Sequence, residues 1–151
     1  MSKVGKLEII LNERAGNGQS MQAWKKVQHY LDNINLNYQV HTTRSNGDGV
    51  RIAKYLANNL EPYSRIIVLG GDGTLNQSLN GVKQSNNPDT PLGYIPGGSG
   101  NDFSRGIKIR KQNPTVLIQK ILAMNEPSII DVGKAQSQDN TKYFVNNIGI
   151  G

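Results

Sequence analysis

The sequence predicts an α/β domain in which a parallel sheet lies between two layers of helices. Residues 7–11, 65–69 and 92–95 are short apolar runs rich in β-branched or aliphatic side chains. Runs of this length are typical of strands that are buried on both faces, as the strands of parallel sheets are. The segments between them carry apolar residues every three or four positions, which is the pattern of amphipathic helices. Alternation of strands and helices builds a parallel sheet that is covered on both sides.

Further elements fill in the N-terminal half of this alternation. A helix is expected from Ser20, because apolar residues follow at mostly three- and four-residue spacing, at Met21, Trp24, Val27, Leu31 and Ile34. Residues 38–42 alternate enough to form a strand, and a glycine-containing turn at 46–49 leads into the next helix. That helix is expected to bury Val50, Ala53, Leu56, Ala57 and Leu60.

The apolar run 65–69 ends in closely spaced glycines and a carboxylate, in the sequence Gly70-Gly-Asp-Gly-Thr74. Glycines let the backbone turn freely and let a ligand approach the main chain closely. Thr74 and Gln77 have the spacing of a capping box, which predicts that a helix starts here. The amide hydrogens at a helix N-terminus bind anions such as phosphates. This stretch therefore predicts an anion site.

Asp72 indicates which anion this site would take. A carboxylate repels phosphate unless a divalent cation stands between the two groups. A nucleotide that arrives with magnesium meets this requirement. The alternative interpretation is that Asp72 only caps the helix and the glycines only turn the chain, since a single motif of this length is weak evidence.

A second glycine turn follows the run at 92–95, in the sequence from Pro96 to Arg105. Ser99 and Asp102 again have capping spacing, so a second helix start is expected. Loops that follow neighbouring parallel strands face the same crevice, which is where open α/β sheets bind ligands. We therefore expect the turns at 70–74 and 97–100 to converge on one pocket. A further amphipathic helix is expected over 116–124, behind Pro114.

The pattern changes near Asn125. Residues 128–132 and 143–150 are strand-like, and a polar turn at 139–140 joins them without a helix between. Consecutive strands after a strand–helix alternation suggest a new domain. The expected organisation is one α/β domain over residues 1–124 and the start of a β-rich domain over residues 125–151.

Composition limits the classes of function. The chain has 151 residues, no cysteine and a formal net charge of +6. The lack of cysteine favours a reducing cytoplasm, and no apolar run approaches membrane-spanning length. The positive charge favours a polyanionic partner. Its densest cluster is at 105–111, where isoleucines alternate with basic residues, and it lacks the features of a nucleic-acid module. We therefore expect contact with an anionic membrane and no nucleic acid.

His29 and His41 lie far apart in the sequence and lack further ligands at the spacing that a zinc site needs.

Taken together, Gly70 to Asn76 and Ile95 to Arg105 resemble the catalytic domain of the diacylglycerol kinases, a group that includes bacterial soluble lipid kinases and the sphingosine and ceramide kinases. Asn12 to Gly16 resembles the first glycine loop of that family, and Thr43 with Gly47-Asp48 resembles its second. The resemblance covers nearly the whole chain. It implies a Rossmann-like three-layer domain with a parallel sheet, of the NAD kinase and diacylglycerol kinase type, followed by the first strands of a truncated β-sandwich domain.

The resemblance also implies ATP and Mg²⁺ as cofactors. Asp72 would be the catalytic residue that organises magnesium and phosphates, and no residue is assigned as a dedicated metal ligand. Ser99 stands where the family usually has threonine, and Gln77 where glutamate is common. The residues implied in nucleotide binding are Asn12, Glu13, Arg14, Ala15, Gly16, Thr43, Gly70, Gly71, Asp72, Gly73, Thr74, Leu75, Asn76 and Ser99.

The implied reaction is transfer of the γ-phosphate of Mg-ATP to a lipid hydroxyl, with diacylglycerol as the first candidate. Family members are about twice as long, and their second domain carries the general base. We therefore expect this chain to be a fragment that binds nucleotide without turnover. An NAD kinase and a non-catalytic nucleotide-binding module remain as alternatives. We expect a cytoplasmic protein that is peripheral to the inner face of the membrane and that could pair with a second copy through exposed strand edges.

Overall fold

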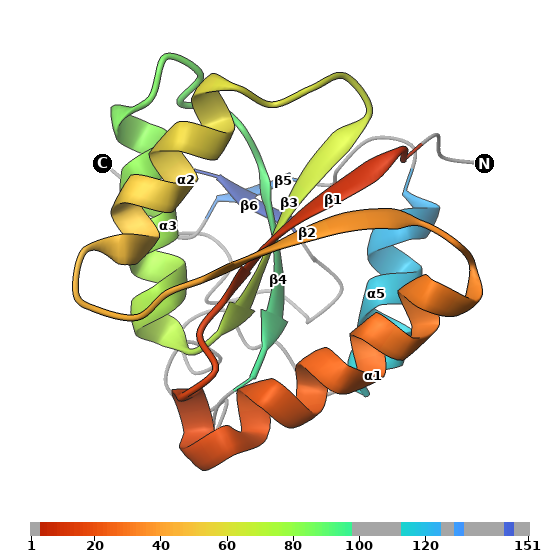
Figure 1. Cartoon of the computed structure of the whole chain (residues 1–151). Helices are drawn as coiled ribbons and strands as arrows, with labels where there is room; N and C mark the ends of the chain where they lie inside the picture. The colour runs from red at the N-terminus through yellow and green to blue at the C-terminus, as the bar shows by residue number, and fades with distance from the viewer. Residues whose placement is uncertain (1–3, 98–112, 125–128, 132–143, 147–151) are drawn as a thin grey trace.

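The computed structural model describes residues 4–97, 113–124, 129–131 and 144–146, and it confirms the expected α/β fold. The described residues form a six-stranded sheet in the order β2-β1-β3-β4-β6-β5 (Figure 1). Strands β2, β1, β3 and β4 are all parallel. The elements are β1 (Lys6–Leu11), α1 (Gln19–Asn33), β2 (Asn37–Thr42), α2 (Asp48–Asn58), β3 (Ser64–Gly70), α3 (Asp72–Gln84), β4 (Leu92–Pro96), α5 (Pro114–Ala123), β5 (Ile129–Asp131) and β6 (Phe144–Asn146).

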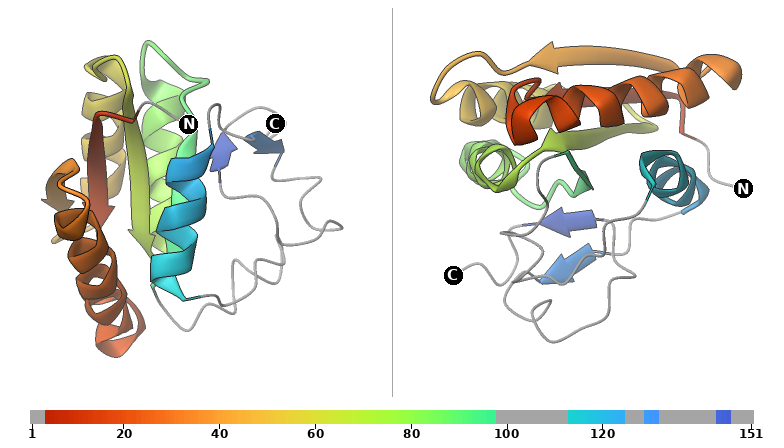
Figure 2. Two further views of the ribbon diagram at one scale, coloured as in Figure 1. Left: turned by 90° about the vertical axis from the view of Figure 1, so that its right-hand side faces the viewer. Right: turned by 90° about the horizontal axis from the view of Figure 1, so that it is seen from below.

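The two faces of the sheet carry separate apolar cores. Ile10 and Val68 face α2 and α3, whereas Ile9 and Ile67 face α1 and α5. Neighbouring residues on one strand point to opposite faces, so each central strand must be apolar along its whole length. The burial of residues 7–11 and 66–70 fits this requirement. Figure 2 shows α1 and α5 on one side of the sheet and α2 and α3 on the other.

Helices α2 and α3 pack closely because small residues meet at their interface. A Cβ atom added at Gly81 would lie 2.2 Å from the carbonyl oxygen of Val50 and 2.9 Å from the Cβ of Ala53. A Cβ atom at Gly49 would lie 2.9 Å from the Cβ of Gln77. The start of α2 is thereby held against the first turns of α3, and both helix N-termini reach the same end of the sheet.

Two details of the sequence-based prediction are wrong. Helix α3 begins at Asp72, with Gly71 as its N-cap residue, and it has no side-chain cap. Thr74 and Gln77 therefore do not form a capping box, because the helix starts earlier and their side chains bond to other segments. Ile34 follows the end of α1 and is 45% exposed, so it does not belong to the buried face of that helix.

The last two strands extend the same sheet. β6 pairs antiparallel with β4, and β5 pairs parallel with β6. Because β5 and β6 are parallel, they do not form the simple hairpin that a single polar turn would produce. The turn at 139–140 lies outside the described residues, and the domain boundary near residue 125 stays a prediction.

Arg65 links the start of β3 to the end of α5. Its guanidinium donates to the carbonyl oxygen of Ile121 at 2.5 Å and to that of Met124. These carbonyls lie at a helix C-terminus, where a cation also interacts favourably with the helix dipole. Burial lowers the pKa of Arg65. None of the helices in the described part of the chain is both long enough and apolar enough to cross a membrane.

Candidate nucleotide site

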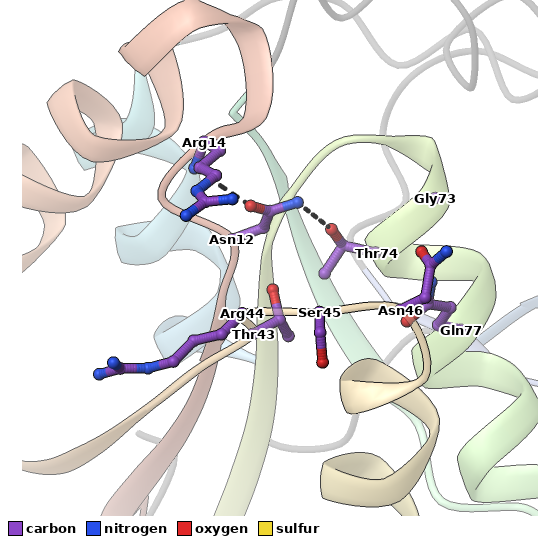
Figure 3. A pocket seen from close by; sticks show the side chains of 9 residues that line it. All are labelled: Asn12, Arg14, Thr43, Arg44, Ser45, Asn46, Gly73, Thr74 and Gln77. Carbon is purple, nitrogen blue, oxygen red and sulfur yellow. Dashed lines mark hydrogen bonds between the residues drawn. The ribbon is translucent and has the colours of Figure 1, made fainter.

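A pocket of about 330 Å³ lies at the carboxyl ends of β1, β2 and β3 (Figure 3). The loop after each of these strands contributes to its wall, as expected for an open α/β sheet. The lining residues are Asn12, Arg14, Thr43, Arg44, Ser45, Asn46, Gly73, Thr74 and Gln77.

Asn12 connects the first loop to the glycine turn. Its amide nitrogen Nδ2 donates to Thr74 Oγ1 at 3.2 Å, and its Oδ1 accepts from the backbone N–H of Arg14 at 3.1 Å. Its own backbone N–H donates to the carbonyl of Leu69 at 3.1 Å. The bond between Asn12 and Thr74 joins residues that are 62 positions apart in the sequence, so it sets the relative position of two walls of the pocket.

The two glycine turns start side by side. Gly70 pairs with Pro96 across β3 and β4, and the carbonyl of Gly70 accepts from the backbone N–H of Gly97 at 2.9 Å. The hydroxyl of Tyr94 donates to the same carbonyl at 3.2 Å. The second turn therefore starts beside the first, but Gly97 does not line the pocket and residues 98–100 lie outside the described residues. The convergence of the two turns on one pocket stays a prediction. The basic cluster at 105–111 also lies outside them.

Gly97 is placed where a side chain would collide with its neighbours, and Gly70 where a side chain would be in tight contact with them. A Cβ atom at Gly70 would lie 3.0 Å from Thr74 Oγ1 and 3.3 Å from the Cβ of Asn12. A Cβ atom at Gly97 would lie 2.3 Å from Ser20 Oγ and 2.8 Å from Ser20 Cα. The absence of a side chain at both positions lets the loops approach one another and α1.

Asp72 occupies the first turn of α3, immediately after the glycine turn. A carboxylate at a helix N-terminus is favoured by the helix dipole. Burial raises the pKa of Tyr94, and the negative charge of Asp72 raises it further. The carboxylate of Asp72 therefore acts electrostatically on the hydroxyl that holds the Gly70 carbonyl. One carboxylate beside helix N–H groups fits Mg²⁺, which commonly uses one or two protein carboxylates together with phosphate oxygens and water.

The loop between β2 and α2 is folded around Asp48. The Asp48 carboxylate accepts from the backbone N–H groups of Arg44 at 2.7 Å and Ser45 at 2.9 Å, and from Ser45 Oγ at 3.3 Å. These bonds, the backbone N–H of Arg44 foremost, hold the pKa of Asp48 below its ordinary value. Gly47, with φ at 90°, provides the left-handed turn into the helix.

The pocket lining contains two arginines and no acidic side chain. In Figure 3, Arg14 and Arg44 lie toward one end of the pocket, and Asn46 and Gln77 toward the other. A concave site lined by one sign of charge concentrates ligands of the opposite sign. The arrangement suits an anionic ligand that also carries hydrogen-bonding groups.

The structure brings together only part of the predicted set. Asn12, Arg14, Thr43, Gly73 and Thr74 line the pocket. The stretch from Gly70 to Asp72 connects β3 to α3 beside the pocket, and Ala15 lies near it, 4.0 Å from a Cβ placed on Gly71. Gly16 belongs to the short 3₁₀ helix Ala15–Gly18 that precedes α1.

The other predicted residues lie elsewhere. Glu13 and Asn76 are exposed and do not line the pocket. Leu75 is fully buried in the core between the sheet, α2 and α3, so its side chain cannot contact a ligand there. Ser99 lies outside the described residues.

Sequence reasoning missed four lining residues, which are Arg44, Ser45, Asn46 and Gln77. The first three directly follow Thr43, and a loop that supplies one site residue at the end of a parallel strand commonly supplies its neighbours. Gln77 lies one helical turn after Gly73 and Thr74, so helical periodicity could have found it.

Neither histidine contributes to the pocket. His41 Nε2 contacts Glu8 Oε1 at 2.8 Å on β1 and β2, and His29 contacts Asn33 on α1. In the described part of the chain, no group of three or more His, Asp or Glu residues is arranged to hold a metal ion.

The model of the family "Diacylglycerol kinase catalytic domain" matches residues 6–135. The chain is 33% identical over 149 residues to the Bacillus subtilis protein named "Putative lipid kinase YtlR", and the match covers 95% of this chain and 47% of that protein. It is 32% identical over 144 residues to a diacylglycerol kinase of the same organism, covering 95% and 45%. A crystal structure of a diacylglycerol kinase from Bacillus anthracis aligns with a TM-score of 0.62 at 28% identity, covering 81% of this chain and 44% of that one.

This chain belongs to the diacylglycerol kinase catalytic domain family. The family match spans both glycine turns and the pocket between β1, β2 and β3. The chain spans about half the length of the curated relatives it matches.

Proposed function

We propose that this chain is the nucleotide-binding part of an ATP-dependent lipid kinase, which transfers the γ-phosphate of Mg-ATP directly to the hydroxyl of a membrane lipid. The observation that carries the proposal is the shared Gly70 carbonyl, which ties the starts of the two glycine turns together next to Asp72 and beside a pocket whose described lining includes two arginines. Diacylglycerol is the first acceptor to test, because relatives carry that name. We further propose that the enzyme works at the cytoplasmic face of an anionic membrane.

The chain's own residues have distinct tasks in this proposal. The backbone N–H groups at the start of α3 donate to phosphate oxygens, and Asn12 keeps Thr74 and the first loop in place around them. Arg14 and Arg44 attract the polyanion to the pocket. Mg²⁺, when bound, neutralises the phosphate charge that develops during transfer, and Asp72 would hold it. Among the site residues that we identify, none is suited to accept the proton of the lipid hydroxyl.

Nucleotide binding is tested by titration calorimetry with ATP, in magnesium and in EDTA. Asp72→Asn is expected to leave the fold intact and to lower the affinity for Mg-ATP on the order of tenfold, because it removes a charged oxygen ligand. Asp89→Asn is the matched control, because Asp89 is exposed in the loop before β4 and does not line this pocket. Equal affinity of the wild type and Asp72→Asn in both conditions would show that the carboxylate only stabilises the helix.

The acceptor is tested with labelled ATP and micelles that contain diacylglycerol, with NAD offered in parallel. We expect this chain alone to bind nucleotide and to transfer no phosphate at a brisk rate, because no site residue in the described part of the chain is suited to act as the base. Brisk phosphorylation of diacylglycerol would show that these 151 residues hold all catalytic groups. Phosphorylation of NAD would favour the alternative of an NAD kinase, and absence of any nucleotide binding would refute the proposal.

A further inference from the structure

We propose that Asp48 is a positioning residue of the nucleotide pocket, which folds residues 43–47 so that Arg44 is presented to the bound nucleotide. The inference rests on the proposed function, and it assigns tasks to two residues outside the predicted nucleotide-binding set. Asp48 does not line the pocket, so it acts through the residues that it holds.

The geometry of Asp48 is specific for this task. Asp48 is a buried residue, with 7% exposure, and each of its carboxylate oxygens has partners. Oδ2 accepts the backbone N–H groups of Arg44 and Ser45, while Oδ1 accepts the Ser45 hydroxyl and, at 2.5 Å, the Arg51 guanidinium. Three of these four donors belong to Arg44 and Ser45, which lie with Thr43 along the lower side of the pocket in Figure 3. Hydrogen bonds to an ionised acceptor are among the stronger ones in proteins.

Backbone hydrogen bonds on both sides of the loop fix its two ends to the rest of the domain. The backbone N–H of Thr43 donates to the carbonyl of Leu11 at 2.9 Å, which anchors the start of the loop at the end of β1. The backbone N–H of Gly49 donates to Gln77 Oε1 at 3.2 Å, which anchors the start of α2 on α3. Between these anchors, Asp48 provides the side-chain bonds that set the path of Arg44 and Ser45.

Arg44 is suited to receive a ligand. Its side chain is exposed at the pocket, and the described residues supply no ion pair to its guanidinium. Asp48 bonds the backbone of Arg44, and no bond to Asp48 ties down its guanidinium, which in Figure 3 extends outward from one end of the pocket. An arginine held by its backbone loses less conformational freedom on binding, and this pre-organisation raises affinity.

Whether substitution of Asp48 weakens or tightens the binding of Mg-ATP distinguishes a positioning role from a simple electrostatic one. Removal of a negative charge near a pocket for an anion should tighten binding by Coulomb's law. If Asp48 positions Arg44, its removal should instead weaken binding. The test measures affinity for Mg-ATP by calorimetry in the wild type, Asp48→Ala, Asp48→Asn, Arg44→Ala and the double variant Asp48→Ala with Arg44→Ala.

We expect Asp48→Ala to bind Mg-ATP roughly tenfold more weakly, the scale of losing charge-assisted hydrogen bonds. Asp48→Asn keeps one acceptor oxygen, so it should recover part of that loss. In the Arg44→Ala background, Asp48→Ala should lower the affinity for Mg-ATP little further, because the side chain that Asp48 positions has already been removed. Asp32→Ala is the control for net charge, because Asp32 is an exposed carboxylate on α1 away from the pocket and should leave the affinity unchanged.

Unchanged or tighter binding by a folded Asp48→Ala or Asp48→Asn variant overturns the inference while leaving the proposed function standing. Additive losses in the double variant overturn it too, since Asp48 would then act independently of Arg44. If Asp48→Ala fails to fold, the affinity of Asp48→Asn decides. A wild-type chain that binds no Mg-ATP overturns both the proposed function and this inference.

Discussion

Ser20 shows how tightly single residues are packed beneath the glycine turns. Its side chain is fully buried on α1, and a side chain at Gly97 would collide with it. The Ser20 hydroxyl has no hydrogen-bond partner among the described residues. A buried hydroxyl without a partner lowers stability, because it has lost its bonds to water.

We predict that Ser20→Ala raises the free energy of unfolding by about 1 kcal/mol, because it removes an unsatisfied polar atom and adds a better helix former. Urea denaturation measures the change. Ser78→Ala is the matched control, since Ser78 is equally buried on α3 but donates to the carbonyl of Thr74 at 2.7 Å. A Ser20→Ala variant that is less stable than the wild type would contradict the prediction.

A second residue-scale prediction concerns acid pH. The hydrogen bonds of Asp48 lower its pKa from the ordinary 3.8, so the stability that they contribute is present above that value. It is lost as the pH falls through the lowered pKa. Asp48→Asn lacks this contribution, and we expect it to be less stable than the wild type at pH 7.

The stability difference between wild type and Asp48→Asn should therefore shrink as the pH drops below about 4. Denaturant unfolding of both proteins from pH 7 down to pH 2.5 measures it. A difference that stays constant over this range would show that the charge of Asp48 makes no contribution to folding.

At the scale of elements, the site depends on the close contact between α2 and α3. The first turns of α3 line the pocket, the loop that leads into α2 lines it too, and the Gly49–Gln77 bond joins the two helices beside it. Glycines at the interface between α2 and α3 let the two backbones approach each other. A Cβ atom at Gly81 would lie too close to the carbonyl oxygen of Val50. A change far from the ligand can therefore move a wall of the pocket.

We predict that Gly81→Ala lowers the free energy of unfolding by roughly 1–3 kcal/mol, the usual range for overpacking, because the new methyl group meets backbone atoms that cannot rotate away. Gly73→Ala on the same helix is the control. A Cβ atom there meets nothing within 4 Å, so the gain in helix propensity should make it neutral or stabilising. Thermal unfolding of both variants decides, and equal effects would show that the α2–α3 interface tolerates the extra atom.

At the scale of the whole molecule, the loops after β1 and β2 and the first turns of α3 build one site at the carboxyl end of the sheet. The same end holds the starts of both glycine turns, and the family match covers all of these segments. A ligand that joins these loops binds the folded state and not the unfolded chain. Binding should therefore stabilise the entire domain.

We predict that Mg-ATP at a hundred times its dissociation constant raises the free energy of unfolding by about 2.7 kcal/mol. Denaturant melts with Mg-ATP, with ATP in EDTA and without ligand measure the shift, and inorganic phosphate serves as the control for binding of a simple anion. Stabilisation by phosphate equal to that by Mg-ATP would show an anion site without selectivity for nucleotides.

The sequence by itself determined the fold class and much of the glycine-turn site. Strand and helix patterns are local properties, because side chains on one face recur every two residues in a strand and every three to four residues in a helix. The glycine turns were also readable, since backbone freedom and a following helix start are encoded in adjacent residues. These features placed Gly73 and Thr74 at the site.

Only the tertiary structure decided which side chains face the pocket. The fold brings Asn12 to Thr74 and Gly49 to Gln77. The side chains of Thr74 and Gln77 therefore bond to distant segments and do not form the predicted capping box. Packing against α2 turns Leu75 into the core, although its neighbours belong to the site. Arg44 and Asn46 joined the pocket because the loop after β2 folds around Asp48. Such choices depend on contacts across the sheet, and local periodicity carries no information about them.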